Sequence, residues 1–449
     1  MTRQIRSVLE TIVAPGALLS EEESRRWQTG RRDGASPVVA LAPSREEEVA
    51  AILARASEEG WPVLPAGSGS WLEGGGPSDV SLVVTTDRMK EMYEYEPADL
   101  TFTSGAGVTL AALGEATEPH GQWLPLDPPG GREGTLGATV SLGIGGPLRH
   151  LYGTPRDHVL GLTLVSGDGR ILRWGGRVVK NVAGFDVTRL TVGSWGSLGV
   201  VTSVSARLFP IPEMDVTLAI PGETLETLLP FARVMARSSL PLAAVELLDS
   251  LRAEGMPQSD GGWESGSPAL ALRLLGTRAQ VAEMEARILS ELAHETATPI
   301  RLEGEGSEVL HRNLSGWENG ADMVLRLSLL PSELRVLLAE ARELKALSEK
   351  GGLEADVRVS AHVGTGVLRV AVSGLVRRDS ELEPWVPVLA GLRTRLEEGG
   401  GTLTLSSGPP PLMNAVGPWG TPGGEEGLLR GLKAEFDPKG ILAPGRLGL

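Results

Sequence analysis

The sequence predicts an α+β fold with two domains, the first rich in short strands and the second built from alternating strands and helices. Three observations lead to this prediction. Clusters of glycine separate short apolar runs as far as about residue 212. After Pro210 and Pro212, apolar runs of strand length alternate with segments of helical periodicity. A chain of 449 residues is also long enough for two or three domains.

The first domain is expected to span residues 1–212. Ser44 and Glu47 form a capping-box pattern ahead of an apolar face, and Gly60 follows its last turn, so a helix is predicted over 44–60. A shorter helix is predicted over 109–118. Apolar runs bounded by turn residues predict short strands at 61–64, 80–85, 100–104, 159–166, 170–174 and 198–209.

The second domain is expected to span residues 213–415 as an antiparallel sheet with helices on one face. Apolar runs predict strands at 214–220, 243–248, 269–275, 323–329, 355–361, 367–374 and 402–406. Helical spacing of apolar residues predicts helices at 222–237, 278–295, 332–348 and 384–398. The C-terminal segment, 416–449, carries one more helix and is expected to pack on the first domain or on the interface.

The composition excludes several classes of protein. Lys and Arg number 42 against 57 Asp and Glu, for a net charge of −15, so the basic surface of a nucleic-acid binder is missing. The chain has no cysteine and can hold no disulfide, thiolate zinc site or iron–sulfur cluster. It shows no secretory signal and no run of 18 apolar residues. We expect a cytoplasmic protein, peripheral at the inner face of a membrane only through a partner.

The loop at residues 65–70 follows a predicted strand and offers successive backbone N–H groups with little side chain in the way. Such a nest can hold a pyrophosphate. The loop carries neither a dinucleotide-fold fingerprint nor a Walker A motif. By itself the loop is a weak signal, and an ordinary tight turn is the better interpretation.

Two further glycine-rich stretches, 135–161 and 175–202, favour the pyrophosphate-binding interpretation of this loop. Residues 175–186 read Gly-Gly-Arg-Val-Val-Lys-Asn-Val-Ala-Gly-Phe-Asp. Together these motifs resemble the FAD-linked oxidase superfamily with the vanillyl-alcohol-oxidase or p-cresol-methylhydroxylase (PCMH) type of fold, and 175–186 is similar to the signature of the FAD-binding subunit of glycolate oxidase. The resemblance runs from about residue 60 to 212 and returns at 437–446, where Ala443 stands in place of the family's usual asparagine.

The resemblance implies a two-part PCMH-type FAD-binding domain followed by a substrate-binding cap domain. It also implies a set of FAD contacts along the pyrophosphate, the ribityl chain, the isoalloxazine and the adenine. Residues 61–76 contain no His or Cys for covalent attachment, so noncovalent FAD is expected. The implied cofactor-binding residues are Pro65, Ala66, Gly67, Ser68, Gly69, Ser70, Pro128, Pro129, Thr135, Leu136, Gly137, Ala138, Ser141, Tyr152, Gly153, Asp157, Val159, Gly193, Gly199, Val200 and Val201.

Three residues are candidates for substrate chemistry. Residues 360–369 resemble the His-x-Gly-x-Gly-x-x-His element of 2-hydroxy-acid dehydrogenases, in which two histidines help to bind a metal. Here His362 is present but Arg369 takes the second place, so no metal site is predicted. His362 is a candidate base or a structural histidine at a strand end. Arg326 could bind a substrate carboxylate through two hydrogen bonds, or it could be a solvated or ion-paired arginine with no role in binding. Lys180 is a candidate for a position near the flavin or on a partner surface.

The resemblance implies oxidation of glycolate or a related 2-hydroxy acid such as D-lactate. In that chemistry a base takes the hydroxyl proton and hydride moves from the α-carbon to flavin N5. Because the chain cannot hold an iron–sulfur cluster, electrons are expected to pass to a partner or to a diffusible acceptor. The resemblance implies a hetero-oligomer with a homologous flavin subunit and an iron–sulfur subunit. Two alternatives stay open: an FAD-binding assembly or electron-relay subunit without its own substrate oxidation, and an independent flavin oxidase of alcohols or sugars.

Overall fold

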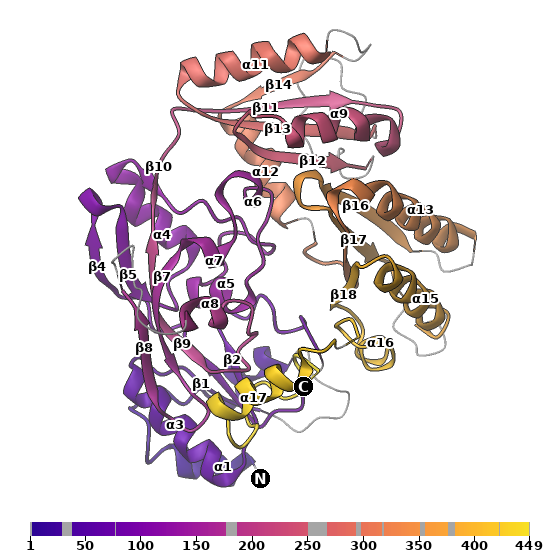
Figure 1. Ribbon diagram of the computed structural model, residues 1–449. Helices are drawn as coiled ribbons and strands as arrows, with labels where there is room; N and C mark the ends of the chain where they lie inside the picture. Colours follow the sequence, from indigo (N-terminus) through magenta and orange to yellow (C-terminus); the bar gives the residue numbers. More distant parts are fainter. Residues whose placement is uncertain are drawn as a thin grey trace. The chain divides into compact units, whose positions relative to one another are not determined.

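The computed structural model of the protein describes residues 2–28, 38–76, 78–176, 186–249, 267–292, 298–316, 318–350, 355–375, 382–421 and 423–448. The chain divides into two compact units (Figure 1). The first unit comprises Met1–Ile144, Thr154–Pro210 and Gly417–Leu449, and the second comprises Gly145–Gly153 and Ile211–Val416. The C-terminal segment therefore belongs to the first unit. The segment Gly145–Gly153, which the sequence places in the first domain, clusters with the second unit.

A small parallel sheet forms one part of the first unit. Its order is β1-β3-β2, with bounds Val39–Leu41, Leu82–Thr85 and Val63–Ala66. Helices α1 (Thr2–Leu9) and α3 (Glu46–Glu59) pack their apolar residues on it in one core. The short helix α2 spans Glu21–Ser24.

The predicted capping box of α3 is wrong in its details. The helix begins after Arg45, whose side chain makes no capping bond. The carboxylate of Glu48, not that of Glu47, accepts a hydrogen bond from the backbone N–H of Ser44, at 2.8 Å. The end of the helix agrees with the prediction, because Gly60 adopts the left-handed conformation that terminates helices (φ 67°).

A five-stranded antiparallel sheet forms the other part of the first unit, in the order β4-β5-β9-β7-β8. The strands span Met92–Glu96, Thr101–Gly105, Val200–Arg207, Val159–Val165 and Ile171–Gly175. A separate pair joins β6 (Gln122–Trp123) to β10 (Phe209–Pro210). The helices of this part are α4 (Leu110–Thr117), α5 (Leu136–Leu142), α7 (Pro155–His158), α8 (Val187–Thr191) and α17 (Glu426–Phe436).

The second unit is built on one eight-stranded antiparallel sheet, in the order β14-β11-β13-β12-β16-β17-β15-β18. The strands span, in that order, Ile300–Glu303, Met214–Pro221, Ala269–Gly276, Leu242–Leu248, Asp356–His362, Val367–Ser373, Met323–Ser328 and Thr402–Ser407. Its helices are α6 (Arg149–Tyr152), α9 (Leu225–Arg237), α11 (Arg278–Leu292), α12 (Glu305–Gly316), α13 (Leu334–Lys350), α15 (Trp385–Glu398) and α16 (Pro410–Val416).

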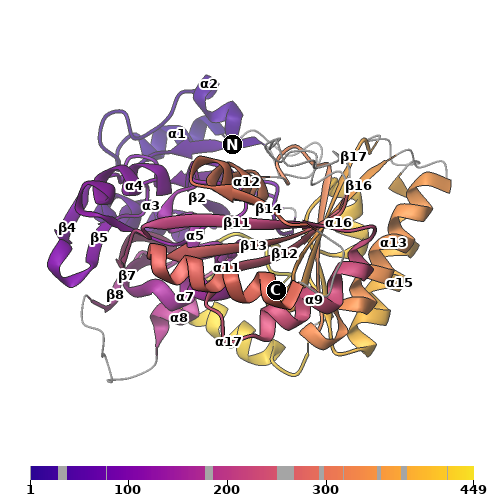
Figure 2. The same cartoon turned by 90° about the horizontal axis from the view of Figure 1, so that it is seen from above.

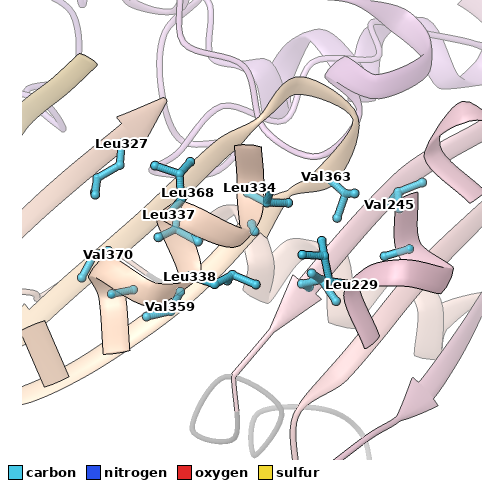
Figure 3. Packing of buried hydrophobic residues seen from close by; sticks show 14 of the residues in the cluster. Leu229, Val245, Leu327, Leu334, Leu337, Leu338, Val359, Val363, Leu368 and Val370 are labelled. Atoms are coloured by element: carbon cyan, nitrogen blue, oxygen red, sulfur yellow. The ribbon is translucent and has the colours of Figure 1, made fainter. Parts of the chain in front are cut away.

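One face of this sheet is apolar and packs on helices α9, α11, α13 and α15 in a single core. Figure 3 shows part of it, where Leu337 and Leu338 of α13 lie among strand residues such as Val359 and Val370. Side chains alternate between the two faces of a strand. The neighbours of these apolar residues along each strand therefore point to the opposite face.

The opposite face carries polar side chains, and α12 covers it at the β11–β14 edge through Leu310 and Leu314. Figure 2 shows α12 and α11 on opposite sides of strands β11 and β13. The prediction of helices on one face is correct for the four main helices and wrong for α12, which the sequence analysis missed. No helix in the described ranges is both long enough and apolar enough to cross a bilayer.

A buried polar network links α12 to the sheet. Arg273 binds the Asp215 carboxylate through two hydrogen bonds, at 3.1 and 2.6 Å. Ser307 Oγ donates to Asp215 at 2.6 Å and lies 2.6 Å from the Thr217 hydroxyl. His311 Nε2 lies 3.1 Å from the Thr217 hydroxyl. Burial, and then the charge of Arg273, lowers the pKa of His311 well below its usual value, so this histidine is neutral in the folded protein.

Acid is expected to destabilise the fold through His311. Below about pH 6.5 the unfolded chain protonates this histidine and the folded chain does not, so stability is complete above that pH and falls below it, by up to about 1.4 kcal/mol per pH unit. We expect His311→Gln to be less stable than wild type near neutral pH and to lose less stability on acidification. Melting temperatures of both proteins between pH 7.5 and 5.5 test this, and parallel profiles would contradict it.

Candidate functional site

The first unit contains a pocket that opens beside the end of β2. Its walls come from three segments: the end of β2 with its following loop, helix α5, and the turn that leads into β9. These segments are far apart in the sequence and meet because β2 ends and β9 begins beside the same helix. Trp71 also lines a smaller adjoining hollow that is bounded by Pro128 and Pro129.

The loop after β2 presents unused backbone donors to this pocket. Among the described residues, no hydrogen bond is donated by the backbone N–H groups of residues 67–70. The loop is held in place from behind, where the Thr85 hydroxyl donates to the Gly67 carbonyl at 2.7 Å. Consecutive N–H groups without partners form a nest for an anion.

Two glycines allow the walls to approach closely. A Cβ atom on Gly67 would lie 2.0 Å from the Thr135 hydroxyl, and one on Gly137 would lie 2.6 Å from the Ala106 Cβ. The Thr135 side chain is the N-cap of α5 and accepts from the Ala138 N–H at 3.4 Å. Only glycine at these positions lets α5 pack against the loop and against the end of β5.

Tryptophan side chains form an apolar wall of the pocket. Trp71 and Trp195 meet edge to face, with ring centroids 6.0 Å apart, and Trp419 lies against Trp195 at 5.2 Å. The indole N–H of Trp71 donates to the Pro129 carbonyl at 3.1 Å, which fixes the ring. A pocket with flat aromatic surfaces next to an anion nest suits a ligand that is part aromatic and part phosphate.

The second unit holds a cluster of charged residues on the polar face of its sheet. Glu246 and His362 stand opposite each other on β12 and β16, and His362 Nδ1 lies 2.6 Å from Glu246 Oε1. Arg369 on β17 stands opposite Arg326 on β15. Arg369 donates to Glu318 at 2.6 Å, and both of these side chains are buried.

The environment of His362 keeps its imidazole neutral. Burial, followed by the positive charges of Arg369, Arg149 and Arg326, lowers the pKa of His362 well below its usual value. The carboxylate at Nδ1 assigns the proton to that nitrogen. Nε2 is then an acceptor, and it is buried without a hydrogen-bond partner in the described part of the chain.

Arg326 differs from its neighbour Arg369. Burial, and then the charges of Arg149 and Arg369, lowers the pKa of Arg326 to about 10, so the guanidinium is still charged at neutral pH. No hydrogen bond or ion pair connects it to any described residue, although its side chain is only half-exposed. A half-buried cation of this kind offers a planar pair of donors to a carboxylate.

Comparisons with known proteins show the family of the chain. Residues 37–175 match a family model described as an FAD binding domain, and residues 211–447 match one described as the C-terminal domain of FAD linked oxidases. The chain is 31% identical over 420 residues to a D-lactate dehydrogenase of Archaeoglobus fulgidus, covering 91% of each protein. The chain belongs to the FAD-linked oxidase family.

Other known proteins are also similar to this chain in sequence or in fold. The glycolate oxidase subunit GlcD of Bacillus subtilis is 28% identical over 426 residues, or 92% of this chain and 89% of that protein. GlcE of Escherichia coli is 45% identical over 125 residues, or 28% of this chain and 36% of that protein. The structure of a 4-ethylphenol oxidase from Gulosibacter chungangensis matches 99% of this chain and 97% of its own, with a TM-score of 0.73 at 19% identity, which shows the shared fold.

The cofactor of this FAD-linked oxidase is FAD, and the residues of the first unit fit it. The unpartnered N–H groups at 67–70 suit a pyrophosphate, and the tryptophan wall suits aromatic rings. The close glycine contacts at Gly67 and Gly137 let α5 approach the loop after β2 and the end of β5. Most of the implied contacts line the pocket or its adjoining hollow: Pro65, Ala66, Gly67, Gly69, Ser70, Pro128, Pro129, Gly137, Ala138, Ser141, Val200 and Val201.

Other implied contacts lie elsewhere and have structural roles. Leu136 and Val159 belong to the core of the first unit, and Asp157 caps α7 by accepting from the Thr154 N–H at 2.8 Å. A Cβ on Gly199 would strike the Leu164 side chain, so this glycine serves packing. Three more residues do not line the pocket. The hydroxyl of Ser68 donates to the Glu133 carbonyl, and Thr135 is the N-cap of α5. The N–H of Gly193 donates to the Val140 carbonyl. Tyr152 and Gly153 fall in the second unit.

The second unit brings His362 and Arg326 into one cluster, as the prediction of a substrate site requires. Lys180 and residues 177–185 of the signature lie outside the described residues. Arg369 stands in place of a second histidine and donates to Glu318. The other side chains near His362 include further arginines, so the residues around His362 do not fit a metal ion.

Sequence reasoning missed several lining residues. Trp71, Trp195, Thr86 and Arg446 line the FAD pocket. Trp71 follows the loop at 65–70, and Trp195 lies inside the stretch 175–202, but no periodicity or spacing distinguishes a tryptophan that borders a pocket from one in the core. Glu246 and Arg149 were missed for a similar reason, since only the strand register and the placement of α6 bring them to His362.

Proposed function

We propose that the chain is an FAD-dependent dehydrogenase of small 2-hydroxy acids, with glycolate or D-lactate as substrate. The observation that carries the proposal is the neutral His362, whose buried Nε2 is free to accept a proton beside an unpaired arginine. The relatives named as D-lactate dehydrogenase and glycolate oxidase support the same substrate class.

Each residue of the cluster has a proposed role. His362 Nε2 takes the proton of the substrate hydroxyl, and Glu246 holds the ring so that Nε2 is the basic nitrogen. Arg326 binds the substrate carboxylate, and Arg369 with Glu318 holds a second cation in place beside it. When bound, noncovalent FAD supplies the two-electron acceptor. The proposal needs no metal.

A substrate panel tests this function. Dye reduction is expected with glycolate or D-lactate and not with 1,2-propanediol, in which the carboxylate is replaced by a neutral group, because Arg326 requires an anion. Equal turnover of the acid and of the neutral alcohol would contradict the proposal and favour an oxidase of alcohols or sugars. Production of hydrogen peroxide would favour the same alternative.

Replacing Arg326 with methionine is expected to raise KM for the acid about tenfold. This is the loss of affinity expected when one charge-assisted, partly solvated hydrogen bond is removed. The kcat should change less than KM, because the base is still in place. Arg301→Met is the matched control, since Arg301 pairs on an exposed edge with Glu285 and Glu303. An unchanged KM in the Arg326 variant would remove this residue from substrate binding.

We also propose that the chain works in a complex at the cytoplasmic side of the cell, with a homologous flavin subunit and an iron–sulfur subunit. The absence of cysteine supports this, because the electrons need a carrier that this chain cannot hold. Relatives named as subunits of glycolate oxidase support it as well. Co-purification with an iron–sulfur protein from co-expressed neighbouring genes tests it, and a monodisperse monomer under those conditions would contradict it.

A further inference from the structure

Arg446 is a buried cation without a counter-charge among the described residues. Its side chain is 4% exposed and lines the FAD pocket of the first unit. One terminal nitrogen, Nη2, donates to the Leu72 carbonyl at 2.5 Å. The other, Nη1, is buried without a hydrogen-bond partner among the described residues.

Two other buried arginines in the described part of the chain show what Arg446 lacks. Arg273 is paired with Asp215, and Arg369 is paired with Glu318. For Arg446, burial alone lowers the pKa, to about 10, and no carboxylate opposes it. The guanidinium is therefore charged at neutral pH and lacks the anion that a buried charge requires.

The residue cannot easily turn away from the pocket. Its backbone carbonyl accepts from the indole N–H of Trp419 at 2.7 Å and from the Gly76 N–H at 3.1 Å. A Cβ atom added at Gly75 would lie 3.3 Å from the Arg446 Cδ, so the chain passes close beside the side chain. A cation fixed in this way, with a donor left over, is organised before its ligand arrives.

We propose that Arg446 is the counter-cation of the bound FAD and that it donates from Nη1 to an anionic group of the cofactor. FAD has two sources of negative charge, the pyrophosphate in every state and the pyrimidine side of the ring after reduction. Both present a hydrogen-bond acceptor that carries charge, which is what Arg446 lacks. The proposal rests on FAD binding in the first unit and not on the identity of the substrate.

Arg446→Gln tests the proposal, because glutamine keeps an N–H donor but loses the charge. If the pyrophosphate is the anion, the dissociation constant for FAD rises at least tenfold and that for riboflavin is unchanged. If the reduced ring is the anion, oxidised FAD binds normally and the midpoint potential falls by about 30 mV for each tenfold loss of affinity for the reduced form. Arg446→Lys is expected to restore most of either effect. Unchanged affinities together with an unchanged potential would overturn the proposal.

A second measurement separates cofactor binding from a structural role. Without FAD, the buried charge is unpaired, so the flavin-depleted Arg446→Gln protein should melt at the same temperature as wild type or higher, while its gain in melting temperature on adding FAD is smaller. A lower melting temperature without FAD would contradict the proposal. Arg430→Gln is the control, since Arg430 forms an exposed pair with Glu426 on α17 and should match wild type in every measurement.

Discussion

Replacing His362 with glutamine is expected to lower kcat for oxidation of a 2-hydroxy acid by about 10²–10⁴-fold, the usual contribution of a general base. The physical reason is the loss of a neutral, buried nitrogen that can accept the hydroxyl proton. The FAD content of the variant should be unchanged, because His362 is not among the residues that line the FAD pocket. Rapid mixing of the variant with substrate, without oxygen, measures the effect directly.

Two further variants make this result specific. Glu246→Gln removes the charge that holds the ring and should lower kcat by about 10–100-fold, the usual effect of a residue that orients a functional histidine. His120→Gln changes an exposed histidine of the first unit and should have no effect. Wild-type activity should also persist somewhat below pH 6.5, because the lowered pKa of His362 leaves the base unprotonated there. A His362 variant with full activity would return this residue to a structural role.

Replacing Gly67 with alanine is expected to weaken FAD binding by about 10–100-fold. The new Cβ would collide with the Thr135 hydroxyl, and relief of that collision costs about 1–3 kcal/mol in a tightly packed site. Displacement of Thr135 also uncaps α5, whose residues Ala138 and Ser141 line the pocket. The loss should therefore fall on the FAD site more than on the whole fold.

Titration of flavin-depleted protein with FAD, followed by flavin fluorescence, measures this loss. Gly431→Ala is the matched control, since a Cβ at that position in α17 meets nothing within 4 Å and alanine favours a helix. If Gly67→Ala binds FAD as tightly as the control does, the loop does not approach α5 as described here.

The main elements of the second unit could be predicted because their side chains alternate or recur with clear periods. Strands such as β13 and helices such as α15 lie within a few residues of their predicted bounds. Helix α12 was missed because its apolar residues, Leu310 and Leu314, are few and cover only a small patch of the sheet. The segment Gly145–Gly153 was assigned to the first domain because chain order gives no sign that a short helix crosses to another unit.

Only part of the candidate site could be predicted from the sequence. Backbone contacts around Gly67 and Gly137 could be found because glycine clusters are visible in sequence. The roles of Arg446 and Glu246 could not be predicted, because they depend on tertiary structure. Arg446 is recognised by the lack of a nearby described counter-charge, and Glu246 by the strand register that places it opposite His362.

We propose that this chain binds FAD and itself oxidises a 2-hydroxy acid. Anaerobic titration of the isolated chain with glycolate or D-lactate, followed at the flavin absorbance near 450 nm, tests this most directly. We expect a yellow protein that bleaches in proportion to the acid added. A yellow protein that keeps its colour would contradict the claim and make the chain a relay or assembly subunit.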